Sequence, residues 1–108
     1  MSRTEERPQV RSSIRPRRQP PYHVILHDDD DHTYEYVIDM LRKLFGHTLE
    51  QAYSIAVEVD QNGLAIVDTT TLERAEFKQE QIHSFGRDLR LQRSDGAMTC
   101  TIEPSVTA

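Results

Sequence analysis

Four consecutive carboxylates are the feature of this sequence most able to do chemistry. Asp28 to Asp31 follow the short apolar run Val24-Ile25-Leu26 and have His27 and His32 on either side. Adjacent like charges repel one another, so a fold gains no stability by gathering them. The run is therefore either a solvated turn, with one Asp capping the next helix, or a site that receives a positively charged group.

A divalent metal ion is one positively charged group to consider here. Consecutive residues of an extended chain point alternately to opposite sides, so the four carboxylates cannot all converge on one ion. The calcium loop of an EF-hand is also a poor match, because Thr33 stands where glycine is required and Asp39 where the bidentate glutamate belongs. We expect no metal and no other cofactor.

Composition narrows the class of function. The chain has 108 residues and a net charge of -5, with six Arg against two Glu in residues 1–21 and seven Lys or Arg against sixteen Asp or Glu beyond them. Such an acidic body lacks the basic face that phosphate binding needs, so we expect no nucleic-acid partner. No apolar run approaches the ~18 residues of a membrane span, and the single Cys100 forms no internal disulfide. We expect a cytoplasmic protein without membrane contact.

The elements that must position the carboxylates belong to one domain. Residues 1–20 are rich in Arg, Pro, Ser and Gln, which predicts a disordered extension in front of a domain over residues 21–108. Apolar periodicity in the domain predicts strands at 22–28, 64–67 and 97–103 and helices at 33–45, 49–61 and 71–85. This order predicts an α+β fold, a compact two-layer β-α-α-β-α-β domain with a three-stranded antiparallel sheet and three helices on one face of it.

Local signals mark the ends and the inner faces of these helices. Thr48 with Gln51, and Thr70 with Glu73, form capping-box patterns that open the second and third helices. Gly46 is suited to end the first helix. The residues of the second helix expected to point inward are Leu49, Ala52, Tyr53, Ala56 and Val59.

With its elements in this order, the chain resembles the ClpS family, adaptors that bring N-degron substrates to a Clp AAA+ protease. The matching segments are Tyr-His-Val-Ile-Leu at 22–26, the acidic turn 28–30, the helix 35–45, Gly-Leu-Ala-Ile-Val at 63–67, Glu73 to Lys78 in the third helix, and Cys-Thr-Ile-Glu at 100–103. The similarity covers about residues 20–104. No one motif is specific to the family, but their order and spacing together are.

The resemblance implies a pocket for the first residue of a peptide, with its free α-amino group and a bulky apolar side chain. The implied peptide-binding residues are Asp28, Asp29, Asp30, His32, Thr33, Tyr34, Val37, Ala56, Val59, Asp60 and Met98. The resemblance also implies that Glu73 and Lys78 contact the N-terminal domain of a Clp-type AAA+ unfoldase. The expected protein is thus a monomeric adaptor and not an enzyme, in keeping with the lack of a convergent Ser/His/Asp or Cys/His set.

Two departures from the family pattern concern charge. Asp28 stands where the family carries Asn, and Asp60 stands where it carries His. An ionised carboxylate accepts hydrogen bonds but cannot donate them, so an amine meets more negative charge while any role needing an N–H donor is lost. Ala56 is expected to enlarge the pocket and Tyr34 to narrow its entrance. Two hypotheses follow: an N-degron adaptor, or a ClpS-like module whose acidic pocket takes a different cationic ligand or partner.

Overall fold

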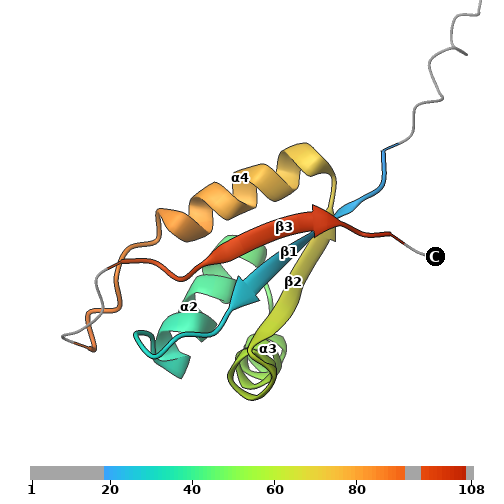
Figure 1. Ribbon diagram of the computed structural model, residues 1–108. Coiled ribbons are helices and arrows are strands. Elements are labelled where there is room, and N and C mark those ends of the chain that lie inside the picture. Colours follow the sequence, from blue (N-terminus) through green and yellow to red (C-terminus); the bar gives the residue numbers. More distant parts are fainter. Residues whose placement is uncertain (1–18, 92–95, 107–108) are drawn as a thin grey trace, which may run out of the picture.

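The computed structural model describes residues 19–91 and 96–106 and has the predicted order of elements. These are β1 (Tyr22–His27), α2 (Tyr34–Phe45), α3 (Leu49–Asn62), β2 (Leu64–Thr70), α4 (Leu72–His83) and β3 (Cys100–Pro104) (Figure 1). The predicted α+β class is confirmed. The extension predicted for residues 1–20 lies almost wholly outside the described residues. Within the described ranges, no helix combines the length and apolar character needed to cross a membrane.

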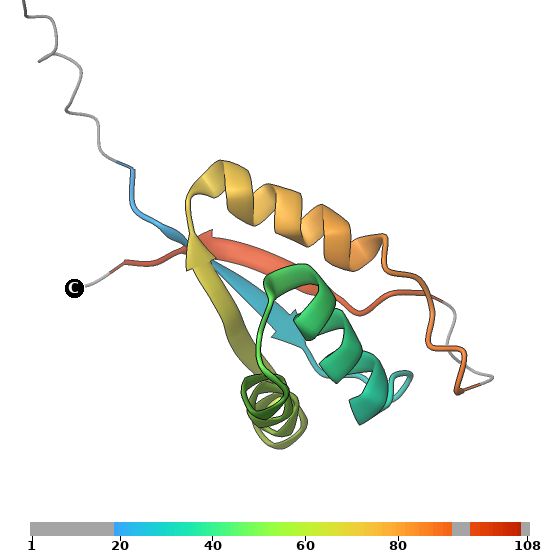
Figure 2. The ribbon, with the colours of Figure 1, turned by 180° about the vertical axis from the view of Figure 1, so that it is seen from behind.

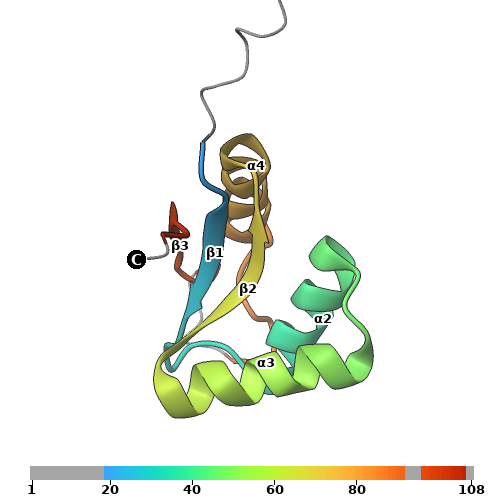
Figure 3. The same cartoon turned by 90° about the vertical axis from the view of Figure 1, so that its right-hand side faces the viewer.

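The sheet is built around β1. Its strand order is β2-β1-β3, and both neighbours run antiparallel to β1. Leu26 lies opposite Ala65 on one side and Cys100 on the other, and the pairing with β2 shifts register between Val24 and Ile25. In Figure 3, α2 lies to the right of this sheet, α4 lies behind β1 and β2, and α3 crosses below the strands. The elements packed around the sheet are therefore helices.

The core lies between the sheet and these helices. Along β2, Ala65 and Val67 are buried while Leu64 and Ile66 are exposed, which is the alternation of a strand with one covered face. From the helical side, Figure 2 shows α4 running beside the strands, α2 crossing the sheet, and α3 seen end-on. Met40 and Leu41 of α2 are fully buried in the core that they share with Val24 and Leu26 of β1. The core therefore fixes α2, whose first turn carries predicted site residues.

The helix ends agree with the sequence signals in part. Thr48 and Gln51 form the complete capping box predicted for α3. The cap predicted at Thr70 is wrong: Thr71 caps α4, because β2 stays paired with β1 as far as Thr70. The helix also ends at His83 with Ser84 as its C-cap, two residues earlier than predicted.

The predicted inner face of α3 was too wide. Ala52, Ala56 and Val59 are buried as expected, but Leu49 and Tyr53 are 52% and 54% exposed. The helix lies at the end of the sheet, where only a narrow stripe of small side chains meets the core. The ring of Tyr53 instead lies 6.1 Å from the ring of Tyr34.

Of the two residues that the resemblance assigns to the unfoldase contact, Glu73 is exposed, whereas Lys78 is buried, with 7% of its surface exposed. Its Nζ donates a hydrogen bond to the backbone carbonyl of Leu44 and lies 5.2 Å from the centre of the Phe45 ring. Burial, together with the nearby charge of Arg74, lowers the pKa of Lys78. The side chain ties α4 to the C-terminal end of α2.

We predict that Lys78→Ala lowers the free energy of unfolding by about 1–3 kcal/mol, because it removes a buried side chain and leaves the half-buried Leu44 carbonyl without its donor. Urea denaturation followed by circular dichroism measures this. Lys43→Ala is the matched control, since Lys43 pairs with Asp39 on the surface and its loss is expected to change stability by at most about 0.5 kcal/mol. Equal effects of the two substitutions on stability would contradict a stabilising hydrogen bond from Lys78 to the Leu44 carbonyl.

Candidate functional site

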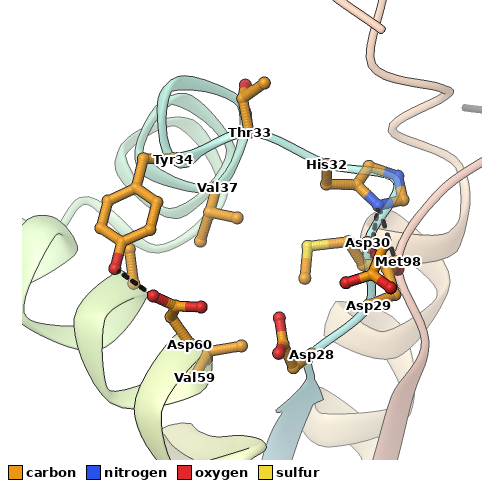
Figure 4. Close-up of a pocket in the computed structure, with 11 residues that line it drawn as sticks. Asp28, Asp29, Asp30, His32, Thr33, Tyr34, Val37, Val59, Asp60 and Met98 are labelled. Carbon is orange, nitrogen blue, oxygen red and sulfur yellow. Dashed lines mark hydrogen bonds and ion pairs between the residues drawn. The ribbon is translucent and has the colours of Figure 1, made fainter. Parts of the chain in front are cut away.

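A pocket of about 220 Å³ opens where β1 ends, between the first turn of α2 and the last turns of α3. Its lining residues are the same eleven that the sequence predicted as peptide-binding: Asp28, Asp29, Asp30, His32, Thr33, Tyr34, Val37, Ala56, Val59, Asp60 and Met98 (Figure 4). The structure therefore brings all eleven together around one cavity. Their binding of a peptide remains a prediction.

The interior of the pocket is apolar. Val37 comes from α2, Ala56 and Val59 from α3, and Met98 from the segment before β3, and all four are buried. Figure 4 shows Val37 and Met98 pointing into the opening. The small Ala56 side chain leaves room where a longer one would fill the cavity. Such a cavity can accept an apolar side chain, which gains by leaving water.

The mouth of the pocket is acidic. The carboxylate of Asp28 reaches it from the turn directly after β1, and that of Asp60 reaches it from α3. Loss of water around Asp28, followed by the negative charge of Asp60, raises the pKa of Asp28 above its ordinary value. A positive group between the two carboxylates would relieve this repulsion.

Tyr34 bridges one side of the mouth. Its hydroxyl donates a hydrogen bond of 2.8 Å to Oδ2 of Asp60, which links the first residue of α2 to the last turns of α3. This bond is the main reason that the pKa of Tyr34 is raised. The arrangement agrees with the expectation that Tyr34 narrows the entrance.

Asp29 holds the turn together. Its Oδ1 accepts from the backbone N–H of Asp31 at 2.9 Å, and Nδ1 of His32 lies 2.8 Å from the same oxygen. On the other edge of the ring, Nε2 of His32 lies 2.7 Å from the carbonyl oxygen of Gly96. Both ring nitrogens of His32 therefore face oxygen atoms that accept hydrogen bonds. The alternative of a structural turn thus fits Asp29, whose carboxylate holds the turn. The expected helix cap at an aspartate is wrong, because the cap of α2 is Thr33.

Asp88 is the site-supporting residue that sequence reasoning missed. It is fully buried, and Oδ2 accepts from the backbone N–H of Thr33 at 2.6 Å. Oδ1 accepts from the backbone N–H of Arg90 at 3.0 Å. Burial alone would raise the pKa of Asp88, but these hydrogen bonds outweigh it and lower the pKa to about 2. Fifty-five positions separate Asp88 from Thr33, so no local pattern could have linked them.

The metal alternative finds no support in the geometry. Among residues 19–91 and 96–106, no group of three or more His, Cys, Asp and Glu side chains is arranged to hold a metal ion. His27, which directly precedes the acidic turn, directs Nε2 to the hydroxyl of Thr101 at 2.7 Å on the open face of the sheet.

Comparison with known families accounts for this combination of fold and pocket. The family model described as "ATP-dependent Clp protease adaptor protein ClpS" matches residues 17–92. The chain belongs to the ClpS family. The match spans the acidic turn, α2, α3, β2 and α4, and therefore ten of the eleven pocket residues, Met98 being the exception.

Curated relatives from several bacteria agree with the ClpS assignment. The ATP-dependent Clp protease adapter protein ClpS of Lawsonia intracellularis is 39% identical over 72 residues, which cover 67% of this chain and 66% of that protein. The protein of the same name from Erwinia tasmaniensis is 35% identical over 92 residues, covering 83% of this chain and 82% of that protein.

A solved structure supports the ClpS fold. Agrobacterium tumefaciens ClpS2 bound to L-phenylalaninamide matches with a TM-score of 0.71 at 23% identity, over 82% of this chain and all of that one. At this identity the match demonstrates the shared α+β fold. The predicted family and fold are thus confirmed by independent sequence and structure comparisons.

We predict that Asp28→Asn raises stability at neutral pH. The pKa of Asp28 is higher in the folded than in the unfolded chain, so its stabilising contribution is present at low pH and is lost as pH rises through the folded-state pKa. Removing the charge should add about 0.2–1 kcal/mol at pH 7, as for other exposed charge pairs, and nothing below pH 3.8. Thermal melts at both pH values measure this. Asp39→Asn, which removes a paired surface carboxylate, should give no gain.

Proposed function

We propose that this chain is an N-degron adaptor. It binds the free amino terminus of substrates that begin with a bulky apolar residue and delivers them to a Clp-type AAA+ unfoldase. The observation that carries the proposal is the apolar cavity of about 220 Å³ with the carboxylates of Asp28 and Asp60 at its mouth. Such an amino terminus carries an apolar side chain next to an ammonium group. The side chain fits the apolar cavity, and the ammonium group fits between the carboxylates.

The two parts of the pocket recognise the two parts of the ligand. The first side chain enters between Val37, Ala56, Val59 and Met98, and its burial contributes roughly 1.5–3 kcal/mol. The α-ammonium remains at the mouth. About 4 Å from a carboxylate it gains roughly 4 kcal/mol at an effective dielectric constant near 20, before desolvation reduces this. Neither part alone gives selective binding, so both are required.

The relatives support this proposal. The curated relatives are named as adapters of the ATP-dependent Clp protease. The related ClpS2 structure is of a complex with L-phenylalaninamide, a molecule with a free α-amine and an aromatic side chain. The unfoldase would dock on α4, where Glu73 is exposed. Lys78 offers little surface to that contact because it is directed at Leu44.

A second candidate function rests on the charge of the mouth. Asp28 and Asp60 replace a neutral amide and an imidazole of the family pattern, so the pocket offers no side-chain hydrogen-bond donor at these two positions when both are ionised. A ligand with a cationic side chain, rather than an apolar one, would use the added charge. The two candidates differ in the first residue that they prefer.

A panel of peptides that differ only in the first residue separates these candidates. We expect tight binding of peptides that begin with Leu, Phe, Tyr or Trp, and at least about tenfold weaker binding of Ala-led and N-acetylated peptides, because each lacks one of the two recognised groups. Fluorescence anisotropy measures the affinities. Ala56→Met, which fills the cavity without altering charge, should weaken the binding of large first residues. Binding led by Arg would favour the second candidate.

The pH dependence of binding provides a further prediction. The raised pKa of Asp28 means that the empty site keeps a proton to higher pH than an ordinary aspartate does, and a bound ammonium must displace that proton. Affinity should therefore rise as the pH rises through the pKa of Asp28, and it should fall above about pH 8, where a free α-amine loses its proton. The acidic limb should flatten in Asp28→Asn. Affinity that stays constant from pH 5 to pH 10 would contradict amine capture.

A further inference from the structure

The first turn of α2 is capped differently from that of α3. In α3, Thr48 accepts from the backbone N–H of Gln51, and Oε1 of Gln51 accepts in return from the backbone N–H of Thr48 at 2.9 Å. In α2, Thr33 likewise accepts from the backbone N–H of Tyr36 at 3.2 Å. The return bond cannot come from Tyr36, because its hydroxyl donates to the carbonyl of Gly86. The Thr33 N–H therefore needs an acceptor from elsewhere.

Asp88 supplies this acceptor from the segment that follows α4. The carboxylate is fully buried and accepts the Thr33 N–H at 2.6 Å, which is short for an N–H donor and typical of a charged acceptor. Arg90 secures the other oxygen through its backbone N–H at 3.0 Å and its Nη1 at 3.3 Å. A negative charge at this end of α2 is also favoured by the helix dipole.

We infer that Asp88 is a positioning residue that completes the cap of α2 from a distance and thereby sets the rim of the pocket. Thr33 and Tyr34 are both rim residues. The carbonyl of Thr33 accepts from the N–H of Val37, which lines the interior. Fixing the backbone of Thr33 through its N–H thus also holds its carbonyl, and with it the wall residue Val37 and the start of the Tyr34 bridge to Asp60. This role goes beyond the residues expected to touch a peptide.

The test compares Asp88→Ala with Gln51→Ala. Both substitutions remove the return half of a helix cap, but the Gln51 cap lies at the end of α3 opposite the pocket. We expect both variants to melt at lower temperature, whereas only Asp88→Ala should weaken the binding of a Phe-led peptide, by about tenfold. If Asp88→Ala does not fold, Asp88→Asn takes its place. The amide has only one accepting oxygen, so its NH₂ group must face the N–H of either Thr33 or Arg90, and one of the two hydrogen bonds is lost.

The measurement of peptide binding rests on the proposed function. Amide hydrogen exchange does not depend on that function and gives a second measurement. Exchange of the Thr33 and Val37 amides should be faster in Asp88→Ala than in Gln51→Ala, in which the Ala52 amide should be affected instead. If wild-type protein binds no peptide of the panel, the proposed function fails and exchange alone decides the role of Asp88. Unchanged exchange at Thr33, or equal loss of affinity in the two variants, would overturn the inference.

Discussion

The pairing of β1 on both of its edges is the constraint on which the rest of the domain depends. At the end of this strand, the His27 N–H donates to the carbonyl of Thr99 at 3.1 Å, and the Asp28 N–H donates to the carbonyl of Gly63 at 2.9 Å. The acidic turn therefore leaves the sheet at one fixed point, between the end of α3 and the segment that leads into β3. The pocket exists because three segments distant in sequence meet there.

Electrostatic repulsion at the mouth is tolerated because it is unevenly distributed. Asp29 is satisfied by the Asp31 N–H and by His32, so its charge serves the local turn. Asp28 also has a backbone hydrogen bond, to Asp29, that lowers its pKa, but burial and the charge of Asp60 outweigh this bond and leave the pKa raised. In the proposed function, an ammonium group between Asp28 and Asp60 would relieve the repulsion that remains.

Sequence reasoning succeeded where the determining interactions are local or the order of elements carries the information. The order of strands and helices and the residues around the pocket were predictable from apolar periodicity and from the family pattern. Sequence reasoning failed where a residue distant in sequence determines the exposure or the hydrogen bonds of a side chain. The exposure of Tyr53, the burial of Lys78 against α2 and the bond between Asp88 and Thr33 all depend on how separate helices and loops meet, which no window of sequence contains. The displaced cap of α4 has the same origin, since strand pairing extends β2.

The burial of Lys78 has a practical consequence for attaching reporters to this protein. The sequence contains two lysines, and the other, Lys43, has a side chain that is 65% exposed. The single cysteine is buried, and burial raises its pKa to about 11, which disfavours thiol-directed reagents. Among lysine side chains, acylating dyes should therefore attach at Lys43. That residue lies nine positions along α2 from Tyr34, or about 13 Å from the pocket rim, so a fluorophore there can follow ligand binding without occupying the cavity.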